Sequence, residues 1–67
     1  MTSFKKGDIV EVTTPTIVVI EGQTEGLSLW HKQGVVLAKK RFPSAQVQVD
    51  FGANGVHWLF KDTVSKL

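Results

Sequence analysis

Apolar and polar residues alternate most regularly in the middle of the chain, where residues 46–51 read Gln-Val-Gln-Val-Asp-Phe. A period of two is expected of a strand that buries one face and exposes the other. Branched and aromatic side chains suit such a half-buried surface. The pattern therefore predicts a strand whose core face carries Val47, Val49 and Phe51.

Two further strands are predicted, one on either side of this segment. Gly34–Lys40 is strand-like, and Val56–Phe60 is apolar at nearly every position, so its inward face stays ambiguous. Asn54-Gly55 supplies two residues that tolerate positive φ, as a two-residue hairpin turn requires. Residues 34–60 thus predict a three-stranded meander.

The N-terminal part predicts two short strands. Val10 and Val12 share one face of the first run and are expected to face the core, with Phe4 packed near them. Pro15 ends this run because it has no N–H to donate to a sheet. The β-branched segment Thr16–Ile20 predicts the next strand.

Glu21–Gln33 is the least regular part of the chain. Gly22 and Gly26 interrupt it, and no helical period runs through it. It is expected to be a long loop that folds back over the mouth of the fold. Whether its apolar residues are core or surface stays open at this point; they are Leu27, Leu29 and Trp30.

The end of the chain completes the predicted architecture. Lys61-Asp62-Thr63 predicts one tight turn, and Val64–Leu67 predicts a short closing strand. The order of strand, long loop, three-strand meander, short turn and final strand is that of a small antiparallel SH3-like barrel. By closing into a barrel, the five to six short strands of such an all-β fold protect their edges. With 67 residues, no repeat and no linker, residues 1–67 are expected to form a single domain.

Composition narrows the chemistry that this chain can perform. It has no cysteine and only two histidines, which excludes disulfides and thiolate metal sites. No signal-peptide run is present, and the longest apolar stretch is far too short to span a bilayer. The sequence predicts a cytoplasmic protein with no membrane insertion, no metal and no cofactor, and it leaves the oligomeric state open.

Charge is unevenly distributed along the chain. The formal net charge is +2, and no acidic residue lies between Glu25 and Asp50, where several cations fall. This asymmetry is compatible with a basic face that meets an anionic partner. The candidate binding residues combine these cations with their aromatic neighbours: Trp30, His31, Lys32, Lys39, Lys40, Arg41 and Phe42. In the simpler interpretation, Phe42 plugs one end of the barrel and the cations are only solvated.

Several motifs run through most of the chain. They are Phe4-x-x-Gly7-Asp8-x-Val10-x-Val12-Thr13, Gly34-x-Val36, Val47-x-Val49 with Phe51-Gly52, and Phe60-x-x-x-Val64-x-x-Leu67. Together they resemble the KOW-type SH3-like barrels of transcription elongation factors and ribosomal proteins. The long insert Pro15–Gln33 departs from that pattern, because those domains have a short loop there. The ending Val56–Asp62 is also similar to Tudor-like domains and to small SH3-like accessory subunits of photosynthetic complexes.

These features predict a non-catalytic interaction module, a small accessory subunit or adaptor. Its partner protein would bind the long loop Pro15–Gln33 and the basic turn Lys39–Ser44, since arginine and aromatic residues are common interface hot spots. The resemblance implies an alternative, which is KOW-like binding of RNA, DNA or the transcription–translation machinery. There the cations would neutralise phosphates while Phe42 or Trp30 stacks on an unpaired base.

Three other interpretations are weaker. An enzyme is not predicted, because Ser28 and His31 lie close in sequence but nothing marks a third group to orient the histidine. An aromatic cage of Trp30 and Trp58 would have no tyrosine to complete it. His57 is expected to be a half-buried histidine whose polar atoms are satisfied.

Overall fold

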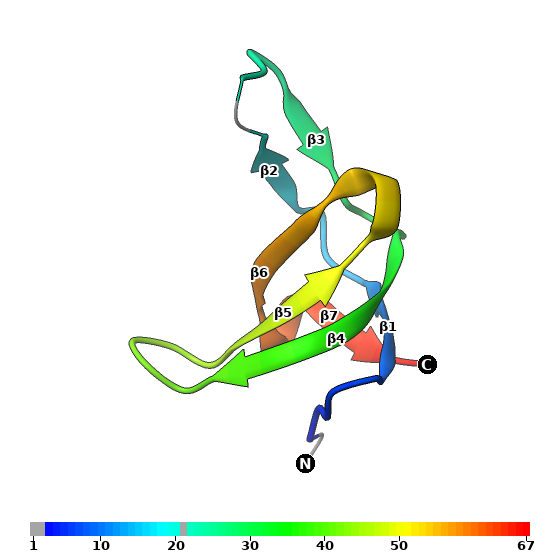
Figure 1. The fold of residues 1–67 in the computed structure, drawn as a ribbon, viewed down its shortest axis with the longest axis vertical. Helices are drawn as coiled ribbons and strands as arrows, with labels where there is room; N and C mark the ends of the chain where they lie inside the picture. Colours follow the sequence, from blue (N-terminus) through cyan, green and yellow to red (C-terminus); the bar gives the residue numbers. More distant parts are fainter. Residues whose placement is uncertain (1–2, 21) are drawn as a thin grey trace.

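The computed structural model describes residues 3–20 and 22–67 as an all-β fold without an α-helix in this part of the chain (Figure 1). The all-β fold class expected from the alternation of residues is therefore confirmed. In chain order the elements are β1 (Ile9–Val12), β2 (Ile17–Val19), β3 (Gly26–Ser28), β4 (Gln33–Lys40), β5 (Gln46–Asp50), the 3-10 turn η1 (Gly52–Asn54), β6 (Val56–Phe60), the 3-10 turn η2 (Lys61–Thr63) and β7 (Val64–Lys66).

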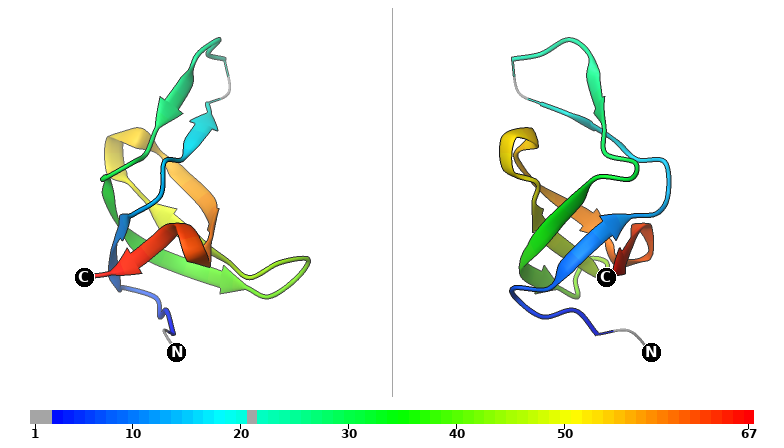
Figure 2. Two further views of the ribbon diagram at one scale, coloured as in Figure 1. Left: turned by 180° about the vertical axis from the view of Figure 1, so that it is seen from behind. Right: turned by 90° about the vertical axis from the view of Figure 1, so that its right-hand side faces the viewer.

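The strands form two antiparallel sheets. Five of them are ordered β6-β5-β4-β1-β7, and β2 pairs with β3 in a separate sheet. The larger sheet folds over on itself, so that β7 lies behind β4 and β5 in Figure 1 and in front of them in the view from behind (Figure 2). Among the described residues no pairing joins β6 to β7. The sheet thus keeps two edges, and the expected closure into a barrel is not observed.

The core lies inside the fold of the larger sheet. Val10 and Val12 are fully buried, and Phe4 packs near them, as the sequence predicts. The predicted core face of the strand over residues 46–51 is also confirmed. The complete set of buried apolar residues in the described chain is Phe4, Val10, Val12, Leu29, Val36, Val47, Val49, Phe51, Leu59 and Val64.

Gly34 allows β4 to approach β5 closely at the centre of this sheet. A Cβ at position 34 would lie 2.6 Å from the carbonyl oxygen of Asp50 and 3.1 Å from the ring of Phe51. Backbone cannot give way easily, so a side chain here would push the two strands apart. The glycine that opens the predicted meander is therefore required by close packing.

The expectation that Glu21–Gln33 is one long loop is wrong. Residues Gly26–Ser28 form β3, which pairs with β2 so that Val18 faces Leu27 across the hairpin. Val18 and Leu27 pack against the core from one face of this hairpin. The three residues of β3 are too few to reveal a period, but an isolated β2 would leave its N–H and C=O groups without partners.

The expected two-residue turn at Asn54-Gly55 is also wrong. The connection between β5 and β6 spans residues 51–55 and contains η1, with positive φ at Gly52 and Gly55 but not at Asn54. The Asp50 carboxylate accepts a hydrogen bond from the Gly52 N–H at 2.8 Å. Because of this side-chain hydrogen bond, the turn begins before Asn54-Gly55, where the backbone preference of those two residues predicts it.

The register of β6 settles which of its faces is buried. Leu59 lies opposite Val47 and His57 lies opposite Val49, so these two side chains share the inner face of the sheet. The other face of β6 is exposed and carries Val56, Trp58 and Phe60. The predicted tight turn at Lys61–Thr63 and the closing strand at Val64–Lys66 are both present.

Candidate functional site

The structure divides the seven predicted binding residues between the two ends of β4. Trp30, His31 and Lys32 precede the strand, whereas Lys39 and Lys40 end it and are followed by Arg41 and Phe42. The strand is eight residues long, which separates the two groups by roughly 23 Å at about 3.3 Å per residue. The cations of the two groups therefore do not form one continuous basic surface.

The basic turn forms part of a pocket of about 430 Å³. The residues that line it are Ser3, Phe4, Lys39, Lys40, Arg41, Ala45, Gln46 and Lys61. Four of these are basic and none is acidic, so the pocket is positively charged. We call these residues the basic pocket.

Lys61 was not among the residues expected from the sequence. It belongs to η2, and its backbone N–H donates to the carbonyl oxygen of Ala45 at 3.2 Å. This bond extends the pairing of Gln46 with Phe60 by one step and brings residue 61 beside the basic turn. The pairing of β5 with β6 is the signal that could have identified Lys61, because an antiparallel hairpin brings the start of its first strand beside the end of its second strand.

The charge of the basic pocket is not neutralised by ion pairs within the described residues. The close contacts between basic and acidic side chains in this part of the chain join His31 to Glu11 and Lys66 to Asp8, and neither involves a residue of the pocket. A concave surface lined by one sign of charge concentrates its field and attracts counter-ions. The basic pocket is accordingly suited to an anionic group.

An exposed aromatic face adjoins the basic pocket. The Nζ of Lys40 lies 4.6 Å from the centre of the Trp58 ring, a cation–π geometry. Trp58 and Phe60 are 41% and 55% exposed on the outer face of β6, and the register puts Gln46 and Gln48 of β5 beside them. Lys40 thus links the basic pocket to an aromatic surface.

Phe42 lies in the loop between β4 and β5 and is 84% exposed. The interpretation in which it plugs one end of the core is therefore wrong. The aromatic residue that is buried next to the basic turn is instead Phe4, which also lines the basic pocket. Phe42 is left free to contact a ligand that is held by the neighbouring cations.

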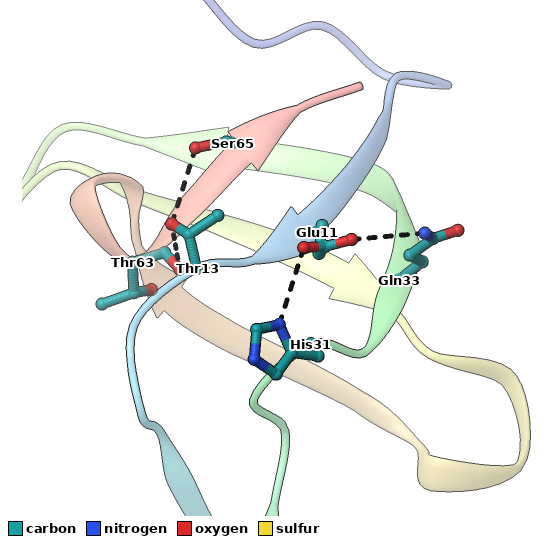
Figure 3. Close-up of polar contacts among 6 residues, drawn as sticks. All are labelled: Glu11, Thr13, His31, Gln33, Thr63 and Ser65. Atoms are coloured by element: carbon teal, nitrogen blue, oxygen red, sulfur yellow. Dashed lines mark hydrogen bonds and ion pairs between the residues drawn. The ribbon is translucent and has the colours of Figure 1, made fainter.

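Of the second group, His31 belongs to a polar cluster with Glu11 and Gln33 at the start of β4 (Figure 3). The rings of Trp30 and His31 stack with their centres 4.7 Å apart. Nδ1 of His31 lies 3.8 Å from Oε2 of Glu11, and Nε2 of Gln33 donates to Oε1 of Glu11 at 3.3 Å. The histidine side chain is 69% exposed, so its contact with Glu11 lies on an open surface.

The two tryptophans do not form a cage. Trp30 belongs to the cluster at the start of β4, while Trp58 lies under Lys40 near the end of the same strand. His57 is half-buried, and its Nε2 lies 2.7 Å from the carbonyl oxygen of Asn54. Its ring is thus hydrogen-bonded, as the sequence interpretation expected.

Residues 3–20 and 22–67 contain no group of three or more His, Cys, Asp or Glu side chains that could hold a metal ion. In the same residues, no helix has the length and apolar character needed to cross a membrane. No family model, curated protein or solved structure matches the chain.

Proposed function

We propose that this chain is a non-catalytic interaction module on an SH3-like scaffold, and that it binds an acidic segment of a partner protein at the basic pocket. The order β6-β5-β4-β1-β7 supports the scaffold, because an SH3-like barrel also joins its first and last strands and inserts its long loop after the first. In this role the chain is an accessory subunit or adaptor of a cytoplasmic complex.

The observation that carries this proposal is that four basic residues and no acidic residue line one pocket beside an exposed aromatic face. Carboxylates of the partner would meet Lys39, Arg41 and Lys61, and arginine can hold a carboxylate in a bidentate manner. Apolar residues next to those carboxylates would cover Trp58 and Phe42. Aromatic residues and arginine are the usual anchors of protein interfaces.

A single-stranded nucleic acid is the second candidate ligand of the same pocket. It is favoured by the absence of any acidic residue from the lining and by the exposed ring of Phe42. Cations can neutralise phosphates while such a ring stacks on a base. A protein ligand is preferred because Val56, Trp58 and Phe60 together extend the apolar surface along the whole of β6, where phosphates would find no partner.

The test is an amide NMR titration of the labelled full chain with two probes. One probe is a twelve-residue peptide that alternates glutamate with leucine, and the other is a twelve-nucleotide single-stranded RNA of uridines. We expect the peptide to shift residues 39–46 and 58–61 and the RNA to bind more weakly. If the RNA binds more tightly than the peptide, with an affinity that falls steeply with salt, the ligand of the pocket is a nucleic acid and not an acidic protein segment. Absence of both effects at low salt would overturn the proposed site.

Charge-reversal variants give this test a matched control. Lys61→Glu changes the charge of the basic pocket, and Lys32→Glu makes the same change at the other end of β4, also on an exposed residue. We expect Lys61→Glu to weaken peptide binding by about tenfold or more, which corresponds to about 1.4 kcal/mol, and Lys32→Glu to change it less than about twofold. Equal effects of the two variants would indicate attraction by net charge alone.

A further inference from the structure

The hairpin of β2 and β3 carries an apolar face that the fold does not cover. Ile17 and Val19 point away from the core and are 72% and 77% exposed. Their cross-strand partners on the same face are Ser28 and Gly26, which are small. Because Val18 and Leu27 between them pack on the core, the hairpin cannot turn over to hide this face.

This face also carries no charge and includes a glycine. A Cβ at position 26 would collide with the Ile17 side chain, so glycine allows that side chain to lie across β3. No charged residue is present on the outer face of the described hairpin, because the chain has no charge between Glu11 and Glu21 and because β3 reads Gly-Leu-Ser. Exposed strands of soluble proteins usually carry a charge or a proline that discourages association, and β2 carries neither.

We propose that this face binds the same face of a second copy of the chain, with the two hairpins stacked about a two-fold axis. In such an isologous contact Ile17 of one copy lies against Val19 of the other, and the reverse contact is equivalent. The patch suits contact with its own copy, since it is apolar and uncharged. Two identical charged patches would repel each other in the same arrangement.

The position of the hairpin favours a second copy as the occupant. The hairpin projects from the larger sheet along the longest axis of the molecule, whereas the loop that carries the basic turn extends sideways from the other end of the fold (Figure 1, Figure 2). Two chains of net charge +2 can therefore meet at their hairpins while their basic pockets stay far apart. The projecting hairpin also keeps the two larger sheets from colliding.

The contact is small, so we expect weak and concentration-dependent association. Interfaces well below about 1,200 Å² belong to transient complexes. A dissociation constant of roughly 0.1–1 mM is therefore expected for the isolated chain. A larger complex that binds two copies through their basic pockets would strengthen it, because linked sites raise the effective concentration.

Sedimentation velocity of the full chain between about 20 µM and 1 mM tests the inference. The weight-average mass should rise from near 7.4 kDa toward twice that value. Val19→Lys places a charge on the face and should keep the chain monomeric throughout this range. A wild-type chain that remains monomeric at 1 mM would overturn the proposal.

Val56→Lys is the matched control, because it makes the same substitution at an exposed valine on the outer face of β6. It should leave self-association unchanged within about twofold, and a loss equal to that of Val19→Lys would assign the contact to β6 instead. Should Val19→Lys fail to fold, Ile17→Thr keeps a β-branched residue and removes apolar surface. In a mixture of differently labelled chains, intermolecular contacts between the methyl groups of Ile17 and Val19 are expected, and contacts elsewhere would contradict the proposal.

This inference and the proposed function fail separately. Val19→Lys lies outside the basic pocket and should leave binding of the acidic peptide unchanged, whereas Lys61→Glu should leave self-association unchanged. The two variants therefore report on two different surfaces.

Discussion

Strands β1 and β2 have similar sequences and opposite environments. β1 reads Ile-Val-Glu-Val and β2 reads Ile-Val-Val. β1 pairs with β4 on one side and β7 on the other. The side chains of its two valines, Val10 and Val12, are fully buried. β2 pairs with β3 alone, and two of its three residues face outward. Residue types therefore determine that a segment becomes a strand, while its neighbours determine what the strand buries.

The comparison also shows how the hairpin is held. Its Val18 and Leu27 contact the core, and Leu29, which follows β3, is fully buried. The Leu29 N–H donates to the Thr16 carbonyl oxygen at 2.8 Å, which closes the base of the hairpin. The hairpin is thus anchored at its base by one large side chain and left open on its outer face.

The largest expected effect comes from removing that anchor. Leu29→Ala should lower the free energy of unfolding by about 3 kcal/mol, because a fully buried leucine loses its contacts and leaves a cavity. Urea denaturation at pH 7 measures this loss. Leu67→Ala, at an exposed leucine, should change stability by less than about 0.5 kcal/mol. A similarly small effect of Leu29→Ala would mean that the hairpin is not anchored through this residue.

Two glycines sharpen the comparison of the sheets. Gly34→Ala should cost about 2 kcal/mol, because its Cβ meets the Asp50 carbonyl oxygen between two paired strands. Gly26→Ala should cost about 1 kcal/mol or less, because its Cβ meets the exposed Ile17 side chain, which can change rotamer. Thermal and urea denaturation of both variants give the two values. The reverse order would contradict the view that only the larger sheet is tightly packed.

A matched pair of valines compares β1 and β2 directly. Val10→Ala should lower the free energy of unfolding by about 2 kcal/mol, from two lost methyl groups and the cavity that remains. Val19→Ala should change it by less than about 0.5 kcal/mol, because the side chain is exposed. Denaturation is measured at about 2 µM, well below the expected dissociation constant for self-association, so that nearly all chains are monomeric. Equal losses would show that β2 buries its outer face in the single chain.

The smallest expected effect concerns Asp8, which ties the start of β1 to β7. The Lys5 backbone N–H donates to its carboxylate at 2.8 Å and lowers the pKa of Asp8 below its ordinary value of 3.8, with a further contribution from Lys66 at 3.3 Å. A lowered pKa stabilises the fold above the ordinary value, and this contribution is lost as the pH falls through the folded pKa.

The variant Asp8→Asn tests this dependence. Its urea midpoint should lie below that of the wild-type chain at pH 7 and 5, and the difference should shrink as the pH falls through the lowered pKa of Asp8, where the wild-type carboxylate becomes protonated. The effect is expected to be small, because the carboxylate is only half-buried, its partner Lys66 is exposed, and water screens their interaction. A difference that grows toward acid pH would contradict the assigned direction of the pKa shift.

The candidate site could be predicted only in part from the sequence. The basic turn was visible as a run of cations beside Phe42, and three of these cations do line one pocket. Lys61 was missed, because only the pairing of β5 with β6 brings it to the same place. Trp30 and Lys32 were grouped with the turn because they are nearby in sequence, whereas an extended β4 carries them to its other end.

Most of the strands followed from local patterns. A period of two in residues 46–51, branched residues in residues 16–20 and a proline at position 15 determined where the chain is extended and where it breaks. The two failures have local causes of another kind. β3 exists because β2 offers it a hydrogen-bonding edge, and the turn before β6 begins early because the Asp50 side chain captures an N–H.

The sequence by itself determined the all-β class, the core face of β1 and β5, and the basic character of the turn after β4. The tertiary structure alone decided which face of β6 is buried, that Phe42 is exposed, and that the two predicted binding groups lie apart. The physical reason is that alternation and residue type act over a few neighbouring residues. Their effects can therefore be recognised from the sequence alone. Burial and the assembly of a site depend on which strands become neighbours, and those contacts join residues far apart in the chain.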